Sequence, residues 1–170
     1  WHQADRYHVP RICYINKMDR IGADFGGVLE EMKAKLAAVP LPLQLPLGAE
    51  SELEGIIDLL EMRELRFHQD DQGMTIEQSP IDPARLAEAE TWRERMMDAL
   101  THISDQLTEM VLGGADIPVP LLKKAIRQGT LARAFTPVLC GASLRNVGVQ
   151  PLLDAVVDYL PSPLDVPPAQ

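Results

Sequence analysis

A group of polar side chains that directly follows an apolar run is suited to reading a guanine base. Asn16, Lys17 and Asp19 follow the mostly apolar segment from Arg11 to Ile15. The carboxylate of Asp19 can accept hydrogen bonds from the ring N–H and the exocyclic amine of guanine, and adenine offers no such pair of donors. Asn16 can bond the base edge and brace a neighbouring loop, while the stem of Lys17 can lie on the ring. The pattern indicates guanine recognition; the alternative is a polar turn before a helix capped by Asp24.

A second loop, far along the chain, has the small residues that such a site requires. Gly141, Ala142 and Ser143 follow the apolar run Pro137–Cys140. A guanine site needs a backbone N–H directed at the base carbonyl, presented by a turn with little side-chain bulk. We therefore predict that the two loops converge on one base.

Two strand–loop–helix units are expected to hold these loops. The run entered through Pro10 indicates a buried strand, and a helix capped by Asp24 should follow it to about residue 38. The strand at 137–140 precedes an amphipathic helix at 150–160. Ligands of open α/β sheets lie beyond the carboxyl ends of the strands, which is where both loops fall. The apolar face expected on the second helix comprises Leu152, Leu153, Val156, Val157 and Leu160.

The segment between the two units has a different pattern. Prolines at 40 and 42 open an extended stretch at 43–47, and further strand candidates lie at 54–62 and 64–69. A turn at 70–73 leads into 74–77, so we expect an antiparallel hairpin.

Helices are predicted after this hairpin. Asp82 as N-cap and Pro83 at the first position begin one long helix, whose apolar stripe runs to Gly113. A shorter helix at 120–128 is expected to end at Gly129 in a left-handed conformation. The outer face of the long helix is acidic, which is typical of a solvated surface or of a contact with a protein partner. Its candidate partner-binding residues are Glu90, Glu94 and Asp98.

Composition excludes several functions. The net charge is −9, from 25 acidic and 16 basic residues, which argues against broad contact with a phosphate backbone and hence against direct DNA binding. No run of 18 apolar residues is present, so no membrane span is expected. Cys13 and Cys140 lie in the two predicted strands, and we interpret them as small buried groups in a reducing cytosol. The cysteines and histidines show no metal-ligand spacing, so no metal site is expected.

The chain resembles bacterial elongation factor G, a family of translational GTPases that act in ribosomal translocation. The segments that carry the resemblance are Trp1–Asp5, Pro10–Ile12, Asn16–Arg20, Gly22–Phe25, Gln44–Glu50, Gly55–Leu59 and Gly148–Pro163. The fold that this implies is α/β: a partial P-loop GTPase-type parallel sheet with helices, carrying an inserted α+β subdomain. The implied division assigns 1–39 and 135–163 to the GTPase domain, 40–134 to the inserted subdomain and 164–170 to a linker.

The resemblance also implies ligands and partners. The parent protein is expected to bind and hydrolyse GTP in the cytoplasm, with the ribosome as partner and the ribosomal stalk protein contacting the inserted subdomain. Because no Gly-x-x-x-x-Gly-Lys-Ser/Thr motif occurs here, Mg²⁺ is expected to be held by residues outside this chain. No catalytic residue is assigned to the chain, which alone is expected to be inactive. The guanine-binding residues implied are Asn16, Lys17, Asp19, Ala142, Ser143 and Leu144.

One departure from the family pattern leaves a second hypothesis open. The second loop usually reads Gly-Ser-Ala, then a bulky residue and Lys, whereas this chain has Ala142 before Ser143, and Arg145 in place of Lys. The exchange keeps the backbone N–H groups but changes where the hydroxyl lies. The alternatives are a ribosome-associated paralogue with a role outside elongation, and an autonomous protein-binding module whose base-reading loops are vestigial.

Overall fold

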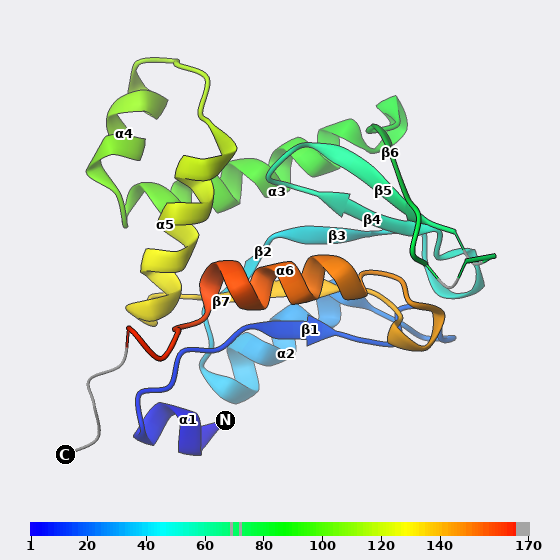
Figure 1. Ribbon diagram of the computed structural model, residues 1–170, viewed down its shortest axis with the longest axis horizontal. Helices are drawn as coiled ribbons and strands as arrows, with labels where there is room; N and C mark the ends of the chain where they lie inside the picture. The colour runs from blue at the N-terminus through cyan, green and yellow to red at the C-terminus, as the bar shows by residue number, and fades with distance from the viewer. Residues whose placement is uncertain (69, 72, 166–170) are drawn as a thin grey trace.

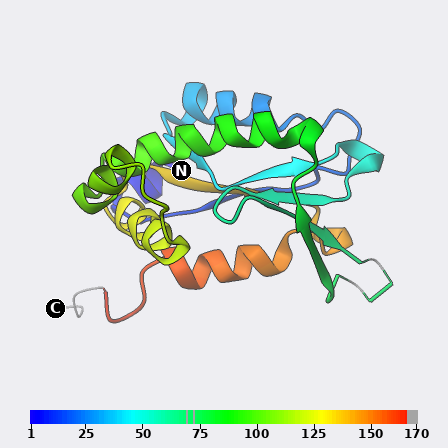
Figure 2. The same cartoon turned by 90° about the horizontal axis from the view of Figure 1, so that it is seen from above.

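A computed structural model of the chain describes residues 1–68, 70, 71 and 73–165. Three predicted segments therefore extend beyond the described residues. They are the turn at 70–73, the strand predicted at 64–69 and the linker at 164–170. The described residues form two β-sheets with helices on both sides of them (Figures 1 and 2).

The first sheet is parallel and contains both strands that were predicted to carry the base-reading loops. Its order is β1 (Cys13–Ile15), β7 (Thr136–Cys140) and β2 (Pro40–Pro42), and β7 pairs in parallel with each neighbour. Every residue of β7 is buried, so this strand forms the centre of the sheet. The predicted α/β class, with a parallel sheet and an α+β insertion, is confirmed.

The second sheet is antiparallel and comes from the middle of the chain. Its strands, in order, are β3 (Gln44–Leu47), β4 (Gly55–Asp58), β5 (Arg63–Phe67) and β6 (Ile76–Pro80). Each strand pairs only with its neighbours in sequence. The predicted hairpin is confirmed, although its last strand runs to residue 80 instead of 77.

Leu43 is the single residue between β2 and β3, and it connects the two sheets. Its N–H donates to the carbonyl of Val138 at 3.0 Å, and its own carbonyl accepts from the N–H of Leu59 at 3.0 Å. The side chain is 2% exposed and belongs to the apolar cluster beneath both sheets. The parallel and antiparallel parts of the molecule therefore share one core.

The helices pack on opposite sides of these sheets. In Figure 2, α2 and α3 lie along one side and α6 along the other. The side chain of Asp24 caps α2 by accepting the N–H of Gly27 at 2.9 Å, and Asp82 caps α3 by accepting that of Ala84 at 2.8 Å. The helices are α1 (His2–Arg6), α2 (Phe25–Leu36), α3 (Pro83–Thr101), α4 (Asp105–Leu112), α5 (Val119–Leu131) and α6 (Val149–Tyr159), with 3₁₀ turns η1 (Glu50–Glu52) and η2 (Ser143–Arg145).

The single long helix predicted from residue 83 to Gly113 is wrong, because the chain breaks after α3. Ser104 adopts an extended backbone conformation and its hydroxyl accepts the N–H of Leu107 at 3.3 Å, which starts α4 as a separate helix. Leu100 and Leu107 are both fully buried on either side of the break. The apolar spacing therefore continues through the bend, and the spacing alone does not reveal it.

Gly129 is not a helix stop, as was predicted, but lies inside α5, which continues to Leu131. A Cβ atom at this position would overlap the ring of Phe135. The left-handed residue lies beyond the helix, at Arg133 with φ 59°. Glycine is needed here for close packing and not for backbone conformation.

The predicted apolar face of α6 is only partly correct. Ala155 and Tyr159 are the buried residues of the helix, and Leu152 packs at the edge of the core. By contrast, Leu153 is 60% exposed and Val157 is 78% exposed. The helix contacts the rest of the described chain along a narrower strip than its apolar residues suggest.

Candidate functional site

The two predicted base-reading loops begin side by side. Ile15, at the end of β1, lies opposite Cys140 at the end of β7. Because the two strands are parallel, the loops that follow them leave the same edge of the sheet (Figure 1). This edge is where open α/β sheets bind ligands.

Three hydrogen bonds join the two loops. The N–H of Gly141 donates to the carbonyl of Ile15 at 3.1 Å, and the N–H of Met18 donates back to the carbonyl of Gly141 at 3.0 Å. The side-chain oxygen of Asn16 accepts the N–H of Ser143 at 3.0 Å, across 127 positions of sequence. Asn16 thus makes the brace to the neighbouring loop that its residue type indicated.

The backbone of the first loop holds its polar side chains at or near the surface. Lys17 has φ 64°, a left-handed conformation that is uncommon outside glycine. Met18 is 3% exposed and anchors the loop to the core, while Asn16 and Lys17 are exposed and Asp19 is partly buried. The loop closes with a bond from the N–H of Arg20 to the carbonyl of Lys17 at 3.0 Å.

The second loop is closed by its own backbone. Ala142 and Val147 exchange hydrogen bonds of 3.0 and 3.1 Å, and the side chain of Ala142 is 1% exposed. The N–H of Ala142 is therefore bonded within the second loop, whereas the N–H of Ser143 is bonded to Asn16 of the first loop. Leu144 lies in the middle of η2 and is 84% exposed.

Tyr14 is a supporting residue of this site that the sequence reasoning did not identify. Its hydroxyl donates to the carbonyl of Val147 at 2.8 Å, which ties β1 to the far side of the second loop. Burial, followed by the proximity of Cys140 and of the Asp19 carboxylate, raises the pKa of Tyr14 well above its ordinary value. The hydroxyl therefore keeps its proton and stays a donor. A tyrosine in a strand that is predicted to be buried needs a partner for its O–H, and this requirement was the available signal.

The acidic residues of α3 line a separate groove, which includes no residue of the two base-reading loops. Glu90, Glu94 and Asp98 are all exposed, as was predicted. They line a groove of about 930 Å³ between α3 and the α4 region, whose opposite wall includes Val111 and Leu112. The groove therefore combines negative charge with apolar surface.

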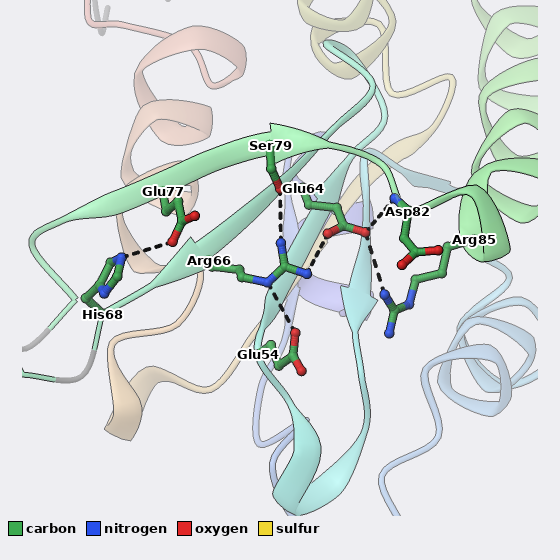
Figure 3. A network of polar contacts seen from close by, with 8 residues as sticks. All are labelled: Glu54, Glu64, Arg66, His68, Glu77, Ser79, Asp82 and Arg85. Atoms are coloured by element: carbon green, nitrogen blue, oxygen red, sulfur yellow. Dashed lines mark hydrogen bonds and ion pairs between the residues drawn. The ribbon is translucent and has the colours of Figure 1, made fainter.

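A second polar cluster, shown in Figure 3, is satisfied within the chain. Glu64 is 1% exposed, and its carboxylate accepts the N–H of Asp82 at 3.0 Å and pairs with Arg66 at 2.7 Å and Arg85 at 3.7 Å. Arg66 also contacts Glu54 at 3.2 Å. These contacts join β5 to the start of α3, and we interpret the cluster as structural.

Neither a metal-binding cluster nor a membrane-spanning helix occurs in the part of the chain that the structure describes. Among these residues, His, Cys, Asp and Glu do not gather in any group of three that could hold a metal ion. None of the described helices is both long and apolar enough to cross a membrane.

The family model and the curated relatives agree on one class of protein. Residues 1–162 match the family model of the elongation factor Tu GTP-binding domain. Over its whole length the chain is 50% identical to elongation factor G 1 from Treponema denticola and 51% identical to elongation factor G 1 from Geobacter sulfurreducens. In each case it covers 25% of the relative. A crystal structure of a protein from Thermus thermophilus superposes with a TM-score of 0.82 at 26% identity, over 97% of this chain and 24% of that one. The chain therefore spans about a quarter of the length of these relatives.

Proposed function

The chain belongs to the translational GTPase family defined by the elongation factor Tu GTP-binding domain, and we propose that it selects the guanine base for an elongation factor G-like parent protein. The observation that carries this proposal is the bond between Asn16 and the N–H of Ser143. It holds the two predicted base-reading loops against each other at the ligand-binding edge of a parallel sheet.

In this proposal each loop residue has a separate task. Asp19 accepts the ring N–H and exocyclic amine of guanine, and Lys17 covers the face of the ring with its stem. The N–H of Ser143 is shared between Asn16 and the base carbonyl. Ala142 keeps the second loop closed, and the exposed Leu144 flanks the base.

GTP and GDP are the ligands that this set of groups fits. A carboxylate acceptor, an amide and a backbone donor on one edge match the polar rim of guanine. The chain lacks a Gly-x-x-x-x-Gly-Lys-Ser/Thr loop, so phosphate and Mg²⁺ binding are assigned to other parts of the parent protein. Since phosphoryl transfer depends on positioning and charge stabilisation of the phosphates, we expect the isolated chain to show no GTP hydrolysis.

An Asp19→Asn substitution in the parent protein tests the assignment. An amide in place of the carboxylate can pair with the altered ring edge of xanthine but not with both donors of guanine, so affinity should move from GDP towards xanthosine diphosphate. Asp24→Asn is the matched control, because an asparagine at that position would still cap α2 and should leave the preference unchanged. Equal affinities of the Asp19 variant and the unchanged protein for both nucleotides would refute guanine selection by this loop.

The proposed division of the chain follows the same assignment. Residues 1–39 and 135–163 would belong to the GTPase domain, 40–134 to an inserted subdomain and 164–170 to a linker. The described part of this division is supported by the two sheets, one parallel and one antiparallel. Pro40–Pro42 pairs with β7, so the insertion begins with a strand that lies in the first sheet.

A protein-binding role of the inserted subdomain is a second proposal, favoured by the groove on α3. Its acidic and apolar walls suit a partner with basic and apolar residues, and the ribosomal stalk protein on a cytoplasmic ribosome is the partner we propose. Reversing the charges with Glu90→Lys and Glu94→Lys should weaken binding of that protein's C-terminal domain, measured by calorimetry. Glu30→Lys, an exposed residue of α2 that does not line the groove, is the control and should bind normally.

A further inference from the structure

One residue of the central segment reaches back to the first base-reading loop. Glu50 begins η1, in the connection between β3 and β4. Its N–H donates to the carbonyl of Met18 at 3.0 Å, and its carboxylate accepts the N–H of Gly22 at 2.8 Å. Glu50 thus contacts the loop on both sides of Asp19.

Met18 is consequently held by both of its peptide groups. Its N–H donates to Gly141 of the second loop at 3.0 Å, and its carbonyl accepts from Glu50. These two groups belong to the peptide planes that join Met18 to Lys17 and to Asp19. The orientation of the Asp19 side chain is therefore set by two contacts to the preceding residue. One comes from the second loop and the other from the η1 turn.

The bond from the Glu50 carboxylate fixes the other end of the turn. Gly22 has φ 81°, a conformation that glycine adopts without strain. The turn that contains Gly22 is closed by a bond from the N–H of Ala23 to the carbonyl of Arg20 at 3.0 Å. Asp19 accordingly sits in a short segment that is anchored at Met18 and at Gly22.

Glu50 adopts an unfavourable backbone conformation where it makes these contacts, and a glycine at a tight position comes two residues before it. Glu50 itself has φ 54°, in the left-handed region that non-glycine residues seldom occupy. Gly48 has φ 86°, and a Cβ atom there would overlap the carbonyl oxygen of Glu52. A strained residue persists only where its surroundings impose it, and such residues cluster at functional sites.

We propose that Glu50 is a positioning residue for guanine recognition, a role that rests on the function proposed above. Hydrogen bonds weaken steeply as their angle departs from linearity, so Asp19 reads both donors of guanine only while its orientation is held. Inosine lacks the exocyclic amine and offers one of these donors. Loosening the loop should therefore reduce the preference for GDP over inosine diphosphate.

Three substitutions at Glu50 in the full-length parent protein separate its side chain from its backbone conformation. Glu50→Gly tolerates the positive φ but has no carboxylate. Glu50→Ala has no carboxylate and also disfavours the positive φ. Glu50→Gln keeps a side-chain oxygen that can accept the Gly22 N–H. The measurement is the ratio of the dissociation constants for inosine diphosphate and GDP. We expect the ratio to fall about three- to tenfold in the Gly and Ala variants and to change less than about twofold in the Gln variant.

The ratio distinguishes positioning from a general loss of folded protein. Unfolding lowers the active fraction for both nucleotides equally and leaves the ratio unchanged. Glu52→Ala, an exposed residue of the same turn, is the control and should retain the full ratio. If the unsubstituted parent does not prefer GDP, the proposed function itself fails. If the parent discriminates and the Gly and Ala variants do so equally well, the role of Glu50 is overturned while the guanine site stands.

Discussion

Single residues of the second sheet show how burial decides what a charged contact contributes. Glu64 is almost completely enclosed and satisfies the backbone N–H of Asp82 as well as two guanidinium groups (Figure 3). The pair formed by His68 and Glu77 at 3.3 Å lies on the same sheet but is exposed. Water screens the second pair fully, whereas the Glu64 carboxylate is shielded from it although its two arginine partners are partly exposed.

We predict that Glu64→Ala is far more destabilising than Glu77→Ala. Removing Glu64 deprives the N–H of Asp82 and the guanidinium of Arg85 of this acceptor and leaves Arg66 with Glu54 and Ser79, which should cost about 1–3 kcal/mol of unfolding free energy. The exposed pair is worth below about 1 kcal/mol. Urea unfolding of the three proteins measures the difference; equal losses for the two variants would show that Glu64 is not an essential part of the sheet.

Among the helices, two glycines with the same helical conformation differ in how much room their surroundings leave for a side chain. Gly129 lies inside α5 against the ring of Phe135, and a Cβ atom would overlap that ring. Gly26 lies exposed in the first turn of α2, where the nearest atom to an added Cβ is 3.7 Å away on Asp24. One position is limited by packing and the other only by backbone entropy.

Alanine substitutions at these positions should act in opposite directions. Gly26→Ala should stabilise the chain by up to about 0.5–1 kcal/mol, because alanine loses less entropy on entering a helix. Gly129→Ala should destabilise it by about 1–3 kcal/mol, because the overpacked core must shift to admit a methyl group. Thermal unfolding followed by circular dichroism measures both effects. A stabilised Gly129→Ala protein would mean that α5 and Phe135 are not in close contact.

For the whole molecule, the layers meet around Asp58. It lies at the end of β4 and lines a cavity of about 200 Å³ between the second sheet and α6. Its carboxylate accepts the N–H of Leu60 at 2.8 Å. Burial raises the pKa of Asp58 above its ordinary value of 3.8, although the Leu60 bond and the charges of Arg63, Lys123 and Arg93 oppose the shift.

This shift predicts a pH dependence that Asp58→Asn should remove. A carboxyl whose pKa is raised by folding binds its proton more tightly in the folded chain, so its contribution to stability falls as pH rises from 3.8 through the folded pKa. The amide can still accept the Leu60 N–H and stays uncharged. The variant should therefore be more stable than the unsubstituted chain at pH 7, with the difference vanishing near and below pH 3.8. Denaturant unfolding at several pH values tests this; parallel curves would contradict it.

Local features of the chain were predictable from the sequence because they depend on residue type and short-range spacing. The side chains that could read guanine, the caps at Asp24 and Asp82, and the two apolar strands that precede the loops all belong to this class. Each depends on a few neighbouring residues, so no distant segment is needed to recognise it.

Only the tertiary structure decided which surfaces are covered and which loops touch. The bend before α4, the role of Gly129 and the exposed side of α6 depend on what packs against each helix, and apolar spacing does not contain that information. The same is true of the contacts of Tyr14 and Glu50 with the two loops. The types of Asn16 and Ser143 were visible in the sequence, but the bond between them exists because parallel pairing of β1 with β7 brings residues 127 positions apart to one edge of the sheet.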